Sequence, residues 1–106
     1  MTRRDRYLWL TYGITQEDYD AILEAQGGTC ALCRRPPRDD KNLHVDHEHV
    51  FGWDRMPPEE RRRYVRGLVD YNCNKFKIGR TTLQGAKAVY DYLRRPPARA
   101  VLRRKK

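Results

Sequence analysis

The residues of this chain with the most chemical potential lie in one short run. All three of its histidines and two carboxylates fall within seven positions, Leu43-His44-Val45-Asp46-His47-Glu48-His49. Strand alternation places His44 and Asp46 on one face and His47 on the other, and a bend after Asp46 would bring Asp46 and His47 together. Such a pair could bind a hard metal ion and deprotonate a water. The alternative is a polar hairpin without chemistry.

The three cysteines offer a second chemistry. Cys30 and Cys33 have the spacing at which two thiolates hold a zinc ion from one side, and Asp70 and Cys73 repeat that spacing. Three interpretations stay open. Asp70 completes a Cys3Asp zinc shell, or water or a histidine completes it, or no zinc is bound and the cysteines are small buried residues.

The length and composition favour one small domain that depends on such a metal. The chain has 106 residues, of which 39% are hydrophobic and 35% charged, so a large apolar core is not expected. Three cysteines cannot pair evenly into disulfides. With no signal peptide or membrane-spanning stretch in the sequence, we expect a reducing cytoplasm, that of the host if the chain is phage-encoded, rather than secretion.

The positive charge is concentrated at the C-terminus. The formal net charge is +9, and residues 94–106 hold seven basic residues and no acid. A basic segment beside a compact site suits a polyanion, and we rank nucleic acid first. The alternatives are solubilising charge or an acidic membrane surface. The expected DNA contacts are Arg61, Arg62, Arg63, Arg66, Lys75, Lys77, Arg94, Arg95, Arg103 and Arg104.

The elements that must position these residues can be read from caps and periodicity. A capping box at Thr15 starts a helix that ends at Gly27, and the histidine run is the first strand. Residues 51–64 are read as an insertion in the hairpin that contains a short helix near Pro57, and residues 65–69 as the second strand. A helix from Cys73 to Gly79 and another over residues 82–93 follow.

Three segments are expected from this pattern. Residues 1–13 form a basic and aromatic arm, residues 14–93 the domain, and residues 94–106 a basic tail. The last helix of the domain is expected to bury its apolar stripe, which comprises Leu83, Ala86, Val89, Tyr90 and Leu93.

Taken together, the motifs resemble a known family. The pattern is Cys30-x-x-Cys33, then the histidine run, then Arg66-Gly67-Leu68, and finally Asp70-x-x-Cys73-Asn74. Over about residues 14–93 the chain resembles the phage recombination endonuclease VII family. These enzymes are His-Me finger (ββα-metal, HNH) nucleases that resolve branched DNA such as Holliday junctions. The implied fold is α+β and mostly helical, with a ββα-metal core stapled by a zinc knuckle.

The resemblance implies a catalytic role at each matching position. Asp46 and Asn74 would hold a catalytic Mg²⁺ or Mn²⁺, and His47 would be the general base that activates water. His49 would contact the scissile phosphate or orient the site, and His44 is a further candidate for that role. These roles fit the chemistry, because oxygen ligands suit a hard cation and a neutral imidazole can accept a proton. By itself, Asn74 could equally cap the helix that follows it.

The same resemblance implies a structural zinc ion. Cys30, Cys33 and Cys73 would be its ligands, and Asp70 stands where family members usually have a fourth cysteine. Well-known members also carry a further catalytic acid in a longer C-terminal part, and no residue of this chain is assigned to it.

The leading functional hypothesis is therefore a metal-dependent DNA endonuclease that resolves Holliday junctions as a homodimer, because resolution needs two symmetric cuts. One alternative keeps the catalytic site without junction selectivity, as in an HNH nicking, homing-type or packaging-associated endonuclease. Another is a zinc-stapled nucleic-acid-binding module without catalysis.

Overall fold

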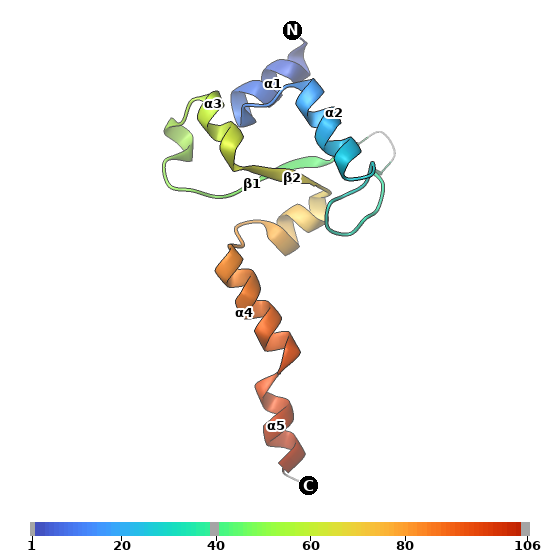
Figure 1. Ribbon diagram of the computed structural model, residues 1–106, viewed down its shortest axis with the longest axis vertical. Helices are drawn as coiled ribbons and strands as arrows, with labels where there is room; N and C mark the ends of the chain where they lie inside the picture. Colours follow the sequence, from blue (N-terminus) through green and yellow to red (C-terminus); the bar gives the residue numbers. More distant parts are fainter. Residues whose placement is uncertain (1, 39–40, 105–106) are drawn as a thin grey trace.

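The computed structural model describes residues 2–38 and 41–104. In this part of the chain the fold is mostly helical, with one small antiparallel sheet (Figure 1). The elements in chain order are α1 (Arg3–Tyr12), α2 (Gln16–Ala25), β1 (His44–His47), the 3₁₀ helix η1 (Trp53–Arg55), α3 (Pro58–Arg61), the 3₁₀ helix η2 (Arg62–Tyr64), β2 (Val65–Val69), the π-helix η3 (Cys73–Ile78), α4 (Leu83–Arg94) and α5 (Pro97–Arg104).

The hairpin of β1 and β2 is the centre of the fold. Val45 pairs with Leu68 and His44 with Val69, so the first pair shares one face of the sheet and the second pair shares the other. Val45, Leu68 and Val69 are buried. Residues of α1 and α2 line the Val45 side, and η3 begins at Cys73, shortly after β2 ends at Val69. The expected second strand, residues 65–69, is confirmed by β2.

The N-terminal segment forms a helix that contributes to the core. Thr2 makes a capping box with Asp5, and Leu8 in the middle of α1 is only 1% exposed. The helix ends at Gly13, whose φ of 73° is accessible to glycine. A Cβ on Gly13 would lie 1.8 Å from the Pro58 carbonyl oxygen, so glycine also allows α1 to meet α3 closely. The expected arm is thus packed as an ordinary helix.

Helix α2 matches the expectation from its cap. Thr15 accepts a hydrogen bond from the Asp18 backbone N–H, and the Asp18 side chain accepts one in return from the Thr15 N–H. Tyr19 is buried, and its hydroxyl donates to the Leu43 carbonyl at 2.7 Å. At the other end of the helix, the Gln26 side chain both donates to the Leu68 carbonyl and accepts from the Leu68 N–H. Helix α2 and its C-terminal cap are therefore tied to the residue before β1 and to β2.

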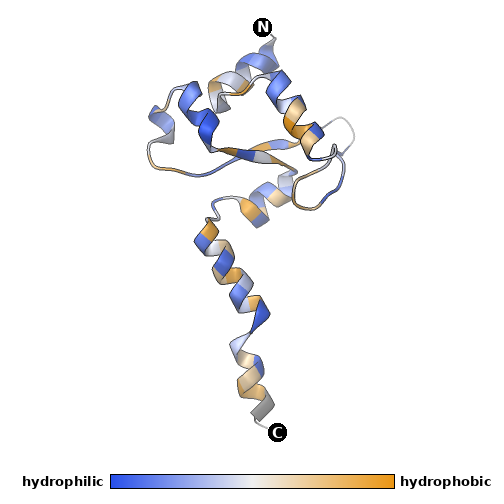
Figure 2. Ribbon diagram, in the orientation of Figure 1, coloured by the Kyte–Doolittle hydropathy of each residue, from blue (hydrophilic) through white to orange (hydrophobic). Residues whose placement is uncertain are grey.

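Helices α4 and α5 project away from the rest of the molecule (Figure 1). The radius of gyration is 17.9 Å, whereas a compact domain of this length has about 13 Å. The prediction that the apolar stripe of α4 is buried is wrong for the single chain: Leu83 is 88% exposed and Leu93 is 65% exposed. The physical reason is that, among the described residues, neither α4 nor α5 packs extensively on another element. Figure 2 shows apolar and polar bands alternating along α4 with no neighbouring ribbon.

The basic tail also contains secondary structure. Helix α4 ends at Arg94, as the two following prolines predict, but Pro97 then begins α5. Arg94 and Arg95 are exposed, whereas Arg103 and Arg104 close α5 with side chains that lie outside the described part. No helix of the described chain is long and apolar enough to cross a membrane.

Candidate active site and metal centre

The pairing register of the hairpin shifts between Asp46 and His47, the two residues whose side chains are best suited to catalysis. Asp46 pairs with Gly67 and His47 pairs with Val65, so β2 contributes the extra residue Arg66 and the register shifts between Asp46 and His47. Such a bulge bends a strand and re-aims its side chains. Here the bulged strand is β2, so Arg66 is the side chain that the bulge directs, and the expected convergence of Asp46 and His47 stays a prediction.

Asp46 is a buried carboxylate held by an arginine. It is 4% exposed, and its two oxygens accept hydrogen bonds from Arg66 Nε at 2.8 Å and Arg66 Nη2 at 3.0 Å. The same guanidinium donates to the Gly79 and Thr81 carbonyls, which follow η3. Arg66 thus connects Asp46 to the segment after η3. A carboxylate has about four lone-pair sites, so two remain with which Asp46 could bind a cation.

His47 lies within an aromatic stack. Its ring centroid is 4.0 Å from the Trp53 ring, with an interplanar angle of 17°, and 4.7 Å from the His49 ring, with an angle of 24°. Tyr12 adds a tilted contact at 5.9 Å. Burial lowers the pKa of His47 below its ordinary value, and the neighbouring His49 lowers it further. His47 is therefore predominantly neutral at pH 7, which is the form that accepts a proton.

Sequence reasoning gave Trp53 no role in the site, and it expected Arg61 to contact DNA rather than to hold the Trp53 ring. The Arg61 guanidinium lies over the Trp53 ring at 4.8 Å, and Arg61 Nε donates to the Trp53 carbonyl. Arg61 Nη1 donates to the Leu10 and Thr11 carbonyls at the end of α1. A path of contacts therefore runs from α1 through Arg61 and Trp53 to His47. The only sequence signal was an aromatic residue in the loop after the histidine run.

Other predicted DNA contacts have different surroundings. Arg62 donates to the Gly13 carbonyl and forms a two-pronged ion pair with Asp18, and this pair lowers the pKa of the Asp18 carboxyl. Arg63 and Lys77 are exposed. Arg61 and Arg62 thus have intramolecular partners, whereas Arg63 and Lys77 present their charges to solvent.

The remaining catalytic candidates are His44, His49 and Asn74. His44 and His49 are exposed, and Asn74 is half-buried in the first turn of η3. The Asn74 backbone N–H donates to the Asp70 carbonyl and its carbonyl accepts from Gly79, so the backbone of Asn74 is fixed at both groups. Its amide side chain is available as the second oxygen ligand that the resemblance implies.

The predicted zinc ligands are brought together. One ligand atom from each of Cys30, Cys33, Asp70 and Cys73 lies within 4.8 Å of the others. A tetrahedral ion with bonds of about 2.3 Å requires ligand separations of about 3.8 Å, so only small adjustments would be needed. The backbone N–H groups of Leu32 and Asp70 point at the Cys30 sulfur at 3.5 and 3.4 Å.

The proton affinities in this cluster also fit a metal site. Burial raises the pKa of Cys73 to about 12, whereas the Cys33 thiol, which donates to Asp70 at 3.0 Å, holds the pKa of Asp70 at about 2. A negative carboxylate therefore already lies among the thiols, and a bound cation would replace their protons. The donor set of three sulfurs and one oxygen suits zinc, so the residues fit the predicted ion.

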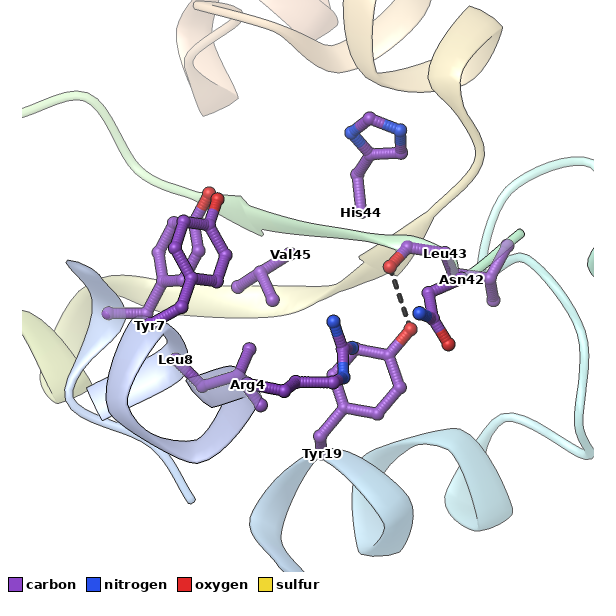
Figure 3. A pocket seen from close by; sticks show the side chains of 9 residues that line it. Arg4, Tyr7, Leu8, Tyr19, Asn42, Leu43, His44 and Val45 are labelled. Carbon is purple, nitrogen blue, oxygen red and sulfur yellow. Dashed lines mark hydrogen bonds between the residues drawn. The ribbon is translucent and has the colours of Figure 1, made fainter. Parts of the chain in front are cut away.

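A small cavity lies on the side of the hairpin that faces α1 and α2. It has a volume of about 180 Å³, and Arg4, Tyr19 and Val45 contribute to its lining. In Figure 3 the His44 ring points away from Arg4 and Tyr19 across β1. Arg4 stacks on the Tyr19 ring and donates to Gln16, so its guanidinium already has partners within the protein. Asp46 and His47 do not line the cavity, although Tyr12, which contacts the His47 ring, does.

The hairpin with its bulge, the buried aspartate and a cysteine cluster that could hold a metal ion define a small, mostly helical α+β protein. Comparison with known proteins adds its family: the model of the recombination endonuclease VII family matches residues 5–95, and the chain belongs to that family. It is 43% identical over 94 residues to the Gene 59 protein of Mycobacterium phage D29, and 39% identical to the Gene 59 protein of Mycobacterium phage L5. Each match covers 87% of this chain, and the chain spans about half the length of these relatives. No solved structure matches it.

Proposed function

We propose that this chain is a divalent-metal-dependent endonuclease with a ββα-metal core that hydrolyses phosphodiester bonds in branched DNA such as a Holliday junction. The observation that carries the proposal is the pair of consecutive residues at the register shift of the hairpin: Asp46 is a buried carboxylate, and His47 has a lowered pKa that keeps its imidazole neutral. Membership in the endonuclease VII family supports the substrate class.

Each residue has a defined part in this proposal. Asp46 and Asn74 would hold Mg²⁺ or Mn²⁺, which supplies charge neutralisation for the phosphate and the leaving oxygen. His47 takes the proton of the attacking water, and the stack of Trp53 and His49 fixes the plane of its ring. Arg66 balances the Asp46 charge. Zinc at the cysteine cluster would fix the start of η3 relative to the hairpin.

The exposed face of α4 supports action as a homodimer. Leu83, Val89, Tyr90 and Leu93 would be covered by a second copy, and a dimer provides the two symmetric sites that resolution of a junction requires. The basic residues 94–106 would then supply sequence-independent contacts with DNA phosphates.

The decisive experiment is a cleavage assay with and without Mg²⁺, on a four-way junction and on a linear duplex of the same sequence. Wild-type protein should cut opposing strands of the junction and spare the duplex. His47→Ala should reduce the rate about 10²- to 10⁴-fold while junction binding persists. Equal cutting of both DNAs would remove the junction preference and leave a nuclease, particularly if sedimentation showed a monomer. Binding by the wild type without any cutting would instead leave a non-catalytic module.

The tail requires its own measurement. Deletion of residues 94–106 should reduce the slope of log binding constant against log salt, because fewer counterions are released. An unchanged slope would show that the tail does not contact DNA.

A further inference from the structure

Two aromatic side chains are exposed on η3 and on the turn before it. Tyr71 is 54% exposed and Phe76 is 72% exposed. Lys75 lies between them, with its Nζ 5.5 Å from each ring centroid, and it donates to the Tyr71 hydroxyl at 3.1 Å. The folded chain thus presents two aromatic rings and one shared cation to solvent.

The π-helical winding of η3 explains this grouping. A π-helix closes hydrogen bonds over five residues rather than four, as the bond from the Gly79 N–H to the Asn74 carbonyl shows. This wider turn places positions five apart near each other on one side. Tyr71 and Phe76 have that separation, and Lys75 lies between them on the same side.

This surface borders the candidate active site. The Tyr71 ring centroid is 5.9 Å from that of His44, which is two positions from Asp46 on the same face of β1. At the other end of η3, Arg66 links Asp46 to the Gly79 carbonyl. Helix η3 is therefore attached at both ends to the face of the hairpin that carries His44 and Asp46.

We propose that Tyr71, Lys75 and Phe76 form a stacking platform for an unpaired nucleobase of DNA, with Lys75 contacting the adjoining phosphate. A flat π face is available on a base that has left the duplex stack and is hidden on a paired base. The cation favours an anionic ligand over an apolar protein surface, and exposed Lys77 adds positive charge to the same helix. The placement of the base beside the cut rests on the proposed nuclease function, but the stacking itself does not.

The test is binding to two duplexes of equal length, one fully paired and one with a two-nucleotide bulge, at fixed salt with Ca²⁺ in place of Mg²⁺. We expect the wild type to prefer the bulge. Phe76→Leu and Tyr71→Leu should each reduce that preference about 5- to 100-fold and leave affinity for paired DNA unchanged. Because both side chains are largely exposed, neither change is expected to unfold the protein.

Matched variants separate stacking from general damage. Phe76→Trp and Tyr71→Phe keep a ring and should keep the preference, and Phe51→Leu removes an even more exposed ring elsewhere and should have no effect. A 2-aminopurine placed in the bulge should lose fluorescence on binding to the wild type and retain it with Phe76→Leu, because stacking quenches this base.

Three results would overturn the platform. The first is an unchanged preference for the bulge in both leucine variants. The second is an equal loss of affinity for the bulged and the paired duplex. The third is a lower oligomer mass in the leucine variants, which would place the two rings in a contact between copies of the chain. The platform and the nuclease can fail separately. If His47→Ala abolishes cleavage but Phe76→Leu keeps the preference, only the platform fails. If no DNA is cut but Phe76→Leu loses the preference, only the nuclease fails.

Discussion

Helices α2 and α4 carry similar local signals for a buried helix, but only α2 packs against the rest of the chain. Each begins after a threonine cap, Thr15 or Thr82, and each carries apolar residues at helical spacing. In α2 the apolar stripe meets the hairpin and Tyr19 is buried, whereas Val89 in the middle of α4 is 57% exposed. The comparison teaches that periodicity identifies a face that favours burial but does not say which surface covers it.

The largest expected effect is on stability and concerns the cysteine cluster, which lies beyond the end of α2 and beside the hairpin. Cys73→Ser should remove most of the stability of this part, because structural zinc contributes about 10 kcal/mol in small zinc domains. The fluorescence of Trp9 and Trp53 should then report unfolding at a much lower temperature. Added zinc should not restore the variant, but it should restore wild type that has been treated with a chelator. A wild-type melting curve for Cys73→Ser would show that the cluster is not a structural metal site.

The comparison can be tested directly with one substitution in each region. Leu8→Ala should lower the free energy of unfolding by about 2–5 kcal/mol, because it opens a cavity in the core. Leu93→Ala should change the stability of the monomer by less than about 0.5 kcal/mol. Urea unfolding at low protein concentration measures both. At higher concentration Leu93→Ala should reduce the dimer fraction, and equal destabilisation by both variants in the monomer would show that α4 packs on its own chain.

A smaller effect is expected where α1 supports the candidate active site through Arg61 and Trp53. Trp53→Ala should slow single-turnover cleavage about 10- to 100-fold by freeing the His47 ring, whereas DNA affinity should change little. Trp53→Phe keeps a stacking partner and should retain most of the rate. Tyr92→Leu on α4 is the control, measured with protein in excess so that dimerisation does not limit the rate. If Trp53→Ala and Tyr92→Leu slowed cleavage equally, the contacts from α1 through Arg61 and Trp53 to His47 would have no specific role in catalysis.

The smallest expected effect is in the pH profile. Since burial lowers the pKa of His47 below 6.5, the imidazole stays neutral as the pH falls through 6.5 and becomes protonated only at lower pH. The acid limb of the single-turnover cleavage rate should therefore lie below pH 6.5. Trp53→Ala exposes the ring and should move the limb upward toward 6.5, whereas the α4 variant Tyr92→Leu should not. A wild-type limb above 6.5 would contradict a half-buried base that is neutral at pH 7.

The local features were predictable from the sequence to different degrees. The strand at residues 65–69, the helix after Cys73 and the grouping of Cys30, Cys33, Asp70 and Cys73 follow from strong local signals: alternation, caps and metal-ligand spacing. The stack of Trp53 on His47 was not predictable, because residues in an irregular loop have no periodicity that fixes their direction. The partners of Arg61 lie about fifty positions away, which local sequence does not encode.

By itself, the sequence determined the chemistry that this protein carries: one run with an acid and an imidazole, three cysteines with metal spacing, and a strongly basic tail. Only the tertiary structure decided which of these groups have partners. It enclosed Asp46 with Arg66 and His47 with Trp53, and it left the rings of Tyr71 and Phe76 and the apolar face of α4 in solvent. The reason is that residue type and spacing are local properties, whereas burial depends on which distant segment the fold brings alongside.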